Sequence, residues 1–336
     1  MKKIVNILIL CVLLMSCVSD PDIQFDNTAR GNVEALWRII DEKYCFIEEK
    51  GIDWNGVLPI YLEKADSVKD QRELFKIMVQ MLDTLHDGHV NLYSAFDVSA
   101  SSGWYDSYPV NFNSSLLPLY IGNDYMTAGG LTYNKIKGHE QIGYIRYSSF
   151  SSSFGSLNMY YVIKYFEDCK GIILDVRNNG GGSLLNAYKL ASTFMKNTTH
   201  VGYWQHKTGP EHDAFSEFEP LYVDSMDMTV KWLRPVVVLC NRRSYSATNT
   251  FVSCMRYAPH AVIIGGKTGG GGGMPLSYEL PNGWMVRLSS VRMTDRDYVS
   301  IEEGVDPDRE VTLVSNDKDD IIEEAIQIIT KIIPQE

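Results

Sequence analysis

Two stretches of the chain share one pattern of apolar and polar positions. Residues 236–240 and 171–175 are apolar runs of strand length, which predict strands buried on both faces. Each run passes into a polar turn and then into apolar residues at helical spacing, over 246–255 and 184–195. The same alternation predicts an α/β fold, and it continues through further strand-like and helix-like runs at 142–150, 157–166 and 261–265.

The pattern near the N-terminus is helical instead. Apolar residues recur at helical spacing over 33–40 and again over 74–82. We therefore predict a small helical N-terminal domain at 28–92 and a larger domain at 93–336. Within the larger domain, the polar and aromatic segment 203–231 is predicted to be an insertion. It is either a lid over a cleft or an ordinary surface loop.

The first residues have the pattern of an export signal. A positively charged start precedes an apolar run at 4–15, which is too short to span a bilayer. The run ends in Leu14-Met-Ser-Cys17, which resembles a bacterial lipobox. We expect a signal peptide at 1–17, a lipid on Cys17 and a tether at 18–27, which would anchor the exported protein in the bacterial cell envelope, with the outer membrane as the expected site. Cleavage near Ser16 or an uncleaved anchor is the alternative.

Composition and charge narrow the classes of partner. The chain has 336 residues, 45% of them hydrophobic, which is enough to bury a large core. Its net charge of −11 argues against nucleic acid, because binding a phosphate backbone needs a basic face. The cysteines lack Cys-x-x-Cys spacing, and His206 and His212 are not at a helical ligand spacing, so no metal or other cofactor is predicted.

Ser246 lies where the predicted strand at 236–240 is followed by a helix. The first free N–H groups of such a helix can hold the oxyanion of an acyl-transfer transition state. Taken alone, this stretch favours a simpler interpretation, in which Ser244 or Ser246 only caps the helix. The second strand and turn shift the balance, because the glycines within 178–182 can adopt positive φ and bring a second backbone N–H group to the same place.

Five motifs resemble those of the C-terminal-processing (tail-specific) serine peptidases, the group that includes the tricorn core protease. They occur in the family's order over roughly residues 85–311. The resemblance implies a crotonase-like ββα-spiral catalytic core that acts without a cofactor. The motifs are Asp87-Gly-His-Val90, Leu174-Asp-Val-Arg-Asn-Asn-Gly-Gly-Gly182, Ser244-Tyr-Ser-Ala-Thr-Asn249, Gly265-Gly-Lys-Thr-Gly-Gly-Gly-Gly-Gly273 and Glu302-Glu-Gly-Val-Asp-Pro-Asp308.

The resemblance also implies roles for single residues. Ser246 matches the nucleophile of the family. The oxyanion donors would be the N–H groups of Ala247 and Gly181, with Gly182 as the alternative because three glycines run together. Asn249 replaces a family glutamate and removes a charge from the nucleophile helix.

The base is assigned by a departure from the family pattern. The processing branch uses a lysine in the Gly-Lys-Gly loop, but Gly271 occupies that position here and Lys267 lies elsewhere in the loop. The tricorn-like alternative is a histidine base oriented by a glutamate, which His89 and Glu302 match. Glu303 is the rival, because the spacing to the following glycine is one residue shorter than in the family. A turn histidine and a solvated acidic turn are the structural alternatives.

We therefore expect a lipid-anchored, exported serine endopeptidase that hydrolyses polypeptides through an acyl-enzyme on Ser246. About fifty residues separate His89 from Gly143, too few for a PDZ domain, so we predict that PDZ is absent. Two alternatives remain. One is a serine hydrolase of non-peptide esters or amides, and the other is a catalytically silent peptide-binding lipoprotein on the same fold.

Overall fold

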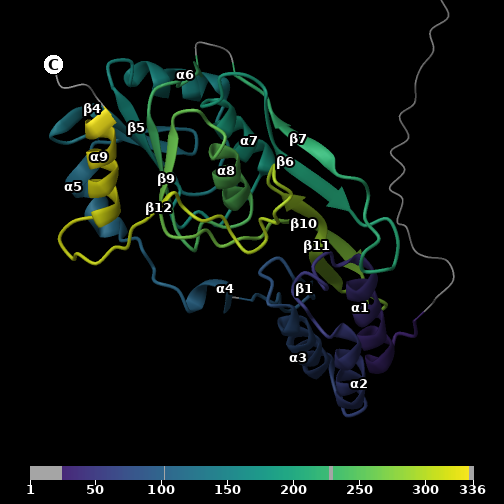
Figure 1. Ribbon diagram of the computed structural model, residues 1–336. Coiled ribbons are helices and arrows are strands. Elements are labelled where there is room, and N and C mark those ends of the chain that lie inside the picture. The colour runs from purple at the N-terminus through teal and green to yellow at the C-terminus, as the bar shows by residue number, and fades with distance from the viewer. Residues whose placement is uncertain (1–24, 102, 227–229, 333–336) are drawn as a thin grey trace, which may run out of the picture.

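The computed structural model describes residues 25–101, 103–226 and 230–332 of the protein (Figure 1). The predicted signal peptide, Cys17 and most of the tether lie outside the described residues. Two sheets with helices packed against them confirm the predicted α/β class. In the described part of the chain, none of the helices is both long and apolar enough to cross a membrane.

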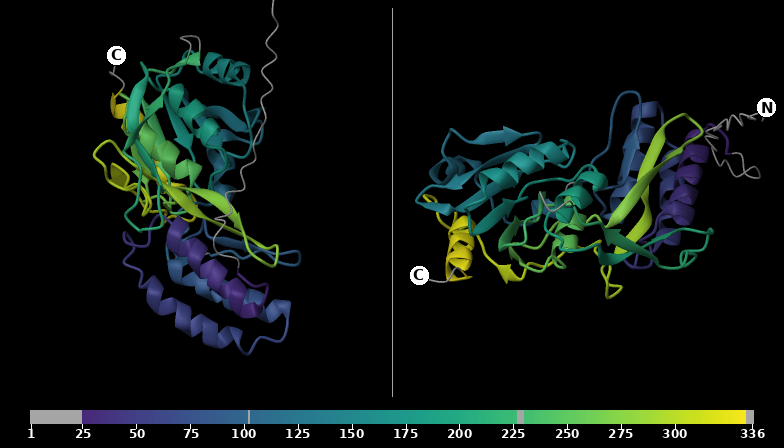
Figure 2. Two further views of the ribbon diagram at one scale, coloured as in Figure 1. Left: turned by 90° about the vertical axis from the view of Figure 1, so that its right-hand side faces the viewer. Right: turned by 90° about the horizontal axis from the view of Figure 1, so that it is seen from above.

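Three helices at the N-terminal end pack together and against one of the sheets (Figure 2). Each begins after a side chain that accepts a hydrogen bond from its first turn, namely Thr28, Asp53 and Asp70. The apolar positions at 33–40 and 74–82 contribute to one shared core, which continues onto that sheet. The helices are α1 (Ala29–Lys43), α2 (Trp54–Ala65) and α3 (Gln71–Leu82), followed by the short 3₁₀ helix η1 (Asp83–Leu85).

The sheet beneath these helices is antiparallel and has five strands. Its order is β1-β11-β6-β7, and β10 also pairs with β11. The predicted insertion at 203–231 contains the end of β6 and the whole of β7, which belong to this sheet. Their backbone groups are paired in the sheet, which a surface loop would not require. The strands are β1 (Asn91–Tyr93), β6 (Thr199–His206), β7 (Glu219–Val223), β10 (Gly273–Glu279) and β11 (Met285–Thr294).

The second sheet has seven strands in the order β12-β9-β8-β5-β4-β3-β2. The strands from β12 to β4 are parallel, and β2 and β3 continue the sheet as antiparallel strands. Every residue of β5 and β8 is buried, as their apolar runs predict. The strands are β2 (Met126–Ala128), β3 (Leu131–Ile136), β4 (His139–Tyr147), β5 (Gly171–Asp175), β8 (Val236–Cys240), β9 (Ala261–Gly265) and β12 (Arg309–Glu310).

Helices cover both faces of the second sheet (Figure 1). Buried residues of α6, α7 and α8 form the core on one face, and buried residues of α5 and α9 form the core on the other. The bounds of these helices are α5 (Leu117–Ile121), α6 (Ser156–Tyr165), α7 (Leu184–Ser192), α8 (Ala247–Met255) and α9 (Asp320–Ile332). Two short elements, α4 (Gly103–Asp106) and η2 (Ser114–Leu116), lie between β1 and β2 in the sequence.

The end of β5 is fixed by a buried ionic network. Arg177 donates to Asp175 at 2.6 Å and to Asp319, the residue before α9, at 2.9 Å. All three side chains are fully buried, and Tyr144 donates to Asp175 at 2.7 Å. Because β5 and β8 are parallel neighbours, the turns that follow them meet at one edge of the sheet. The network therefore anchors one of the two turns that form the site.

Candidate active site

Ser246 lies in the turn between β8 and α8, in an unusual backbone conformation. Its φ is 58° and its ψ is −123°, a region that non-glycine residues rarely adopt. The Ser246 N–H donates to the Gly270 carbonyl at 2.8 Å, and the hydroxyl makes no capping hydrogen bond to the helix. Instead, the Ser246 Oγ lies 2.8 Å from Nε2 of His89. The capping interpretation therefore does not describe this serine.

Ser244 has a structural role, but its hydroxyl does not cap the helix. Its hydroxyl donates to the Val176 carbonyl at 2.9 Å and accepts from the Asn241 N–H at 3.1 Å. These hydrogen bonds tie the turn after β8 to the end of β5. They help to hold the backbone of the nucleophile turn in place.

His89 reaches the serine from the side of the other sheet, because it lies two residues before β1. Its backbone N–H donates to Oδ1 of Asp87 at 2.7 Å, and its ring lies 4.9 Å from the ring of Tyr245. Burial is the main reason that the pKa of His89 is lowered to about 4; the charge of Asp87 opposes this shift, and the positive charges of Arg287 and Lys50 add to it. The imidazole is therefore neutral at pH 7, so that Nε2 can accept the serine proton.

In that tautomer the proton of the His89 ring is on Nδ1, which is buried. The Gly273 backbone lies close enough to raise the pKa of His89 slightly, but no group among the described residues meets hydrogen-bond geometry at Nδ1. The predicted orienting residue, Glu302, is not hydrogen-bonded to the imidazole. Oε1 of Glu302 lies 2.9 Å from Nζ of Lys50, and Oε2 has no described partner. The rival Glu303 is exposed.

Lys50 and Asp87 are site residues for which the sequence analysis gave no role. Nζ of Lys50 lies between two buried carboxyl groups, 2.9 Å from Glu302 and 3.9 Å from Asp87. Burial alone would raise the pKa of Asp87, but Lys50, His89 and the Tyr44 hydroxyl at 2.9 Å hold it below its usual range. Burial and the charge of Asp87 raise the pKa of Glu302 to about 8. Asp87 lies in a motif that the sequence shows, whereas Lys50 has no sequence signal.

The predicted oxyanion donors adjoin the nucleophile. Gly181, with a φ of 99°, packs so closely that an added Cβ would lie 2.8 Å from Cβ of Ser246 and 3.0 Å from the Ala247 nitrogen. The Gly181 N–H, however, donates to Oδ1 of Asn179 at 3.0 Å. Within the described residues, the N–H groups of Ala247 and Gly182 make no hydrogen bond, so both are available as donors beside the nucleophile.

Tyr245 occupies the space that a lysine base would need. A Cβ added to Gly271 would lie 2.6–3.0 Å from atoms of the Tyr245 side chain, which stacks on Trp104 with ring centroids 4.0 Å apart. Lys267 points to Asp306, with Nζ 3.6 Å from the carboxylate, and is 41% exposed. Asn249 is buried and ties α8 to two loops, through its contacts with Thr268 and the Ile301 carbonyl.

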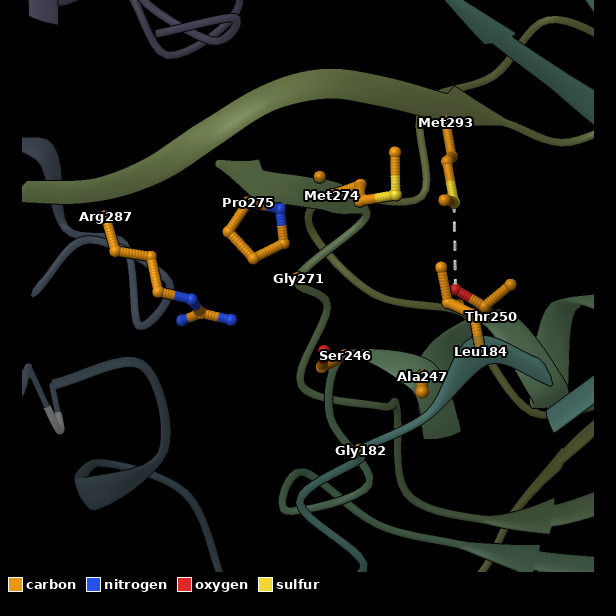
Figure 3. A pocket seen from close by; sticks show the side chains of 11 residues that line it. Gly182, Leu184, Ser246, Ala247, Thr250, Gly271, Met274, Pro275, Arg287 and Met293 are labelled. Atoms are coloured by element: carbon orange, nitrogen blue, oxygen red, sulfur yellow. Dashed lines mark hydrogen bonds between the residues drawn. The ribbon is translucent and has the colours of Figure 1, made fainter. Parts of the chain in front are cut away.

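A cavity of about 220 Å³ opens beside the nucleophile (Figure 3). Residues from β10, β11, α8 and the turn after β5 form its wall. None of the described residues of 203–231 is among the residues that line it. The lining residues are Gly182, Leu184, Ser246, Ala247, Thr250, Gly271, Gly273, Met274, Pro275, Arg287 and Met293.

The fold and the paired serine and histidine define the class of the molecule as a serine-hydrolase scaffold, with the serine at the wall of a cavity. The chain belongs to peptidase family S41, whose family model matches residues 141–311, and the model of the tricorn protease C1 domain matches residues 25–83. The resemblance stated from the motifs is therefore confirmed.

Similar proteins include one solved structure and two curated bacterial proteases. The crystal structure of a peptidase candidate from Parabacteroides merdae is 44% identical, with a TM-score of 0.86, and the match covers 90% of this chain and 97% of that one. A probable CtpA-like serine protease of Staphylococcus saprophyticus is 27% identical over 57% of this chain and 37% of its own length. A carboxyl-terminal-processing protease of Synechocystis is 27% identical over 51% of this chain and 38% of its own. The matches thus span less than half of the length of these curated relatives.

Proposed function

We propose that the protein is a serine endopeptidase with Ser246 as nucleophile and His89 as general base. The observation that carries this proposal is the 2.8 Å contact between the serine hydroxyl and a buried, neutral imidazole, in a chain of peptidase family S41. A hydroxyl is a weak nucleophile until an adjacent base takes its proton. The contact has the length that such a transfer needs.

The proposed reaction has two halves. Ser246 Oγ attacks the peptide carbonyl carbon while its proton moves to Nε2 of His89. The C–N bond then breaks, the imidazolium returns the proton to the leaving amine, and an acyl-enzyme remains. Water attacks the ester in the same way, so that the carboxylic acid and the free serine result. The N–H groups of Ala247 and Gly182 would hold the oxyanion in both halves.

Asp87 supplies the negative charge that the imidazolium needs. Asp87 is held in its ionised form and contacts the backbone of His89, so its negative charge favours protonation of the ring during the reaction. With its pKa raised to about 8, Glu302 is mostly protonated at pH 7, and we propose that it holds Lys50 in place beside Asp87. Asp87 then acts as an electrostatic group and Glu302 as a positioning group, and neither takes up the serine proton.

A degradation assay tests the proposed activity. Wild type is expected to cut a reduced, carboxymethylated protein into fragments, and Ser246→Ala is expected to leave it intact. Hydrolysis of p-nitrophenyl esters without any cleavage of polypeptide would favour the hydrolase of small esters or amides. Loss of both activities in a folded protein that still binds peptides would favour the silent binding protein.

We also propose that the protein is exported and anchored by a lipid on Cys17. The charged start, the apolar run at 4–15 and the lipobox-like Leu14-Met-Ser-Cys17 support this proposal. Metabolic labelling with an alkyne fatty acid should mark wild type but not Cys17→Ser, and the variant should leave the membrane fraction. Equal membrane retention of an unlabelled Cys17→Ser protein would contradict the anchor.

A further inference from the structure

The cavity beside Ser246 has two chemically different ends (Figure 3). Leu184, Met274 and Met293 form an apolar end, where the Thr250 hydroxyl is turned to the sulfur of Met293 at 3.9 Å. Arg287 lines the same cavity, and in the view of Figure 3 Ser246 lies between its guanidinium and the Met293 side chain. A substrate that fills the cavity therefore meets apolar surface on one side and a cation on the other.

The guanidinium of Arg287 is only partly engaged. Nη1 donates to the His89 carbonyl at 3.4 Å and to Oδ1 of Asn91 at 3.1 Å. Within the described residues, no carboxylate pairs with Arg287, and Nε and Nη2 make no hydrogen bond. These remaining donors match the two oxygens of a carboxylate. The two contacts of Nη1 hold the side chain in place, which reduces the conformational entropy lost when a ligand binds.

Arg292 shows by contrast how an arginine of the same strand is satisfied. Its Nε donates to Oε1 of Gln205 at 2.9 Å, and its guanidinium lies 3.8 Å from the ring of Phe215. Arg292 does not line the cavity. Arg287 is also close enough to the reacting centre that its charge lowers the pKa of His89. A carboxylate bound there would lie beside the catalytic pair.

We propose that Arg287 binds a carboxylate of the substrate polypeptide while the apolar end of the cavity holds an apolar side chain. This inference rests on the proposed peptidase activity and names its substrate class: peptide bonds with an apolar residue and a carboxylate close to the cleavage site. The carboxylate comes either from an Asp or Glu side chain or from the C-terminus of a short leaving segment. Lysine and arginine are disfavoured at the same position, because their charge would lie against the guanidinium.

Matched peptides test the inference through the ratio kcat/KM. The series keeps one apolar residue and moves a single Glu from three residues before it to three residues after it, with an amidated C-terminus. A Gln series is the neutral control, and a third series carries no Glu but has a free C-terminal carboxylate. At the preferred position, wild type should cleave the peptide with a carboxylate roughly 10- to 100-fold faster than its neutral counterpart, as expected for a charge-assisted hydrogen bond. The series that shows the preference identifies the source of the carboxylate.

Variants assign the preference to Arg287. Arg287→Gln should remove it, while Arg287→Lys should keep part of it and also serves if the glutamine variant fails to fold. Arg292→Gln should keep the whole preference. A merely structural role of Arg287 beside His89 would instead lower kcat/KM equally for acidic and neutral peptides. Equal cleavage of both peptides by wild type, or a preference that persists in both Arg287 variants, overturns the inference.

A binding measurement separates this inference from the proposed activity. In Ser246→Ala, fluorescence anisotropy with the same peptides should give a Kd at least 10-fold lower for the carboxylate form, and Arg287→Gln should abolish the difference. Absence of hydrolysis by wild type would count against the peptidase, yet the binding difference would still be measured. Equal Kd values for carboxylate and neutral peptides in Ser246→Ala would overturn the role of Arg287.

Discussion

Replacing Lys50 with methionine removes the cation that lies between two buried carboxyl groups. The Lys50 side chain is 12% exposed, and its Nζ lies 2.9 Å from Glu302 and 3.9 Å from Asp87. Loss of one partner from a buried ion pair destabilises a protein by about 3–5 kcal/mol, because the remaining charge stays desolvated. The pKa of Glu302 is already raised to about 8, so protonation at neutral pH relieves part of that charge. We therefore expect the lower end, about 3 kcal/mol.

The destabilisation of Lys50→Met should depend on pH with a defined sign. Lys50 lowers the pKa values of Asp87 and Glu302, so its removal raises both. A carboxyl group whose pKa is raised by folding stabilises the fold below its unfolded pKa, and this contribution is lost as the pH rises through its folded pKa. Of these two carboxyl groups, only Glu302 has a raised pKa in wild type. In the variant, the effect of burial on Asp87 is no longer opposed by Lys50, so the pKa of Asp87 rises as well. The deficit relative to wild type should therefore grow between pH 5 and pH 9.

Thermal unfolding at pH 5, 7 and 9 measures both effects. At 2–4 °C per kcal/mol, the expected loss corresponds to a fall in Tm of roughly 6–12 °C at pH 7. Lys43→Met, which removes an exposed partner of Glu42, should shift the free energy of unfolding by less than about 0.5 kcal/mol. Adding Glu302→Gln to Lys50→Met should restore part of the stability, because the second buried charge is then absent. A Lys50→Met protein as stable as the Lys43 control, or a double variant with simply additive losses, would refute the ionic account of this cluster.

Three further predictions concern the nucleophile, the base and the support of β5. Ser246→Gly should raise the free energy of unfolding by about 1 kcal/mol, because glycine adopts a φ of 58° without strain. Thermal unfolding should show this as a higher Tm, and an unchanged or lower Tm would count against strain at this turn. The pKa of His89 is lowered to about 4, so the imidazole stays neutral on acidification. The rate at which a fluorophosphonate labels Ser246 should therefore be constant from pH 8 to pH 5 and fall to half near pH 4. A midpoint near pH 6.5 would contradict the buried imidazole. Arg177→Met should lower the free energy of unfolding by about 3–5 kcal/mol, because Asp175 and Asp319 then lose their buried partner. Urea denaturation measures this loss, and a value below about 1 kcal/mol would show that the network is dispensable.

The sequence predicts the strand and turn before α7 and the strand and turn before α8, because each depends on a local pattern. The buried runs of β5 and β8 and the helical spacing that follows them are short-range features, and the motifs around Ser246 and His89 place the pair. The segment 203–231 was harder, because β6 and β7 pair across a polar loop and their pattern does not alternate cleanly. Strand pairing of this kind is decided by tertiary contacts that no local window contains.

The surroundings of the imidazole could not be predicted from the sequence. Lys50 lies in a turn after α1, and only the packing of the helical domain against the sheet of β1 brings it to Glu302. Glu302 matches a family position, but its hydrogen bond goes to that lysine rather than to His89. A motif fixes the type of residue at a position, whereas its partner depends on side chains from distant parts of the chain.

The central claim is that Ser246 and His89 act as one nucleophile and its base. Intact-protein and peptide mass spectrometry after fluorophosphonate treatment measures this most directly. We expect one label per chain, on Ser246, with a labelling rate that falls about 10²- to 10⁴-fold in folded His89→Ala, as expected when a general base is removed. A folded wild-type protein that takes no label, or a His89→Ala protein labelled as fast as wild type, would contradict the account.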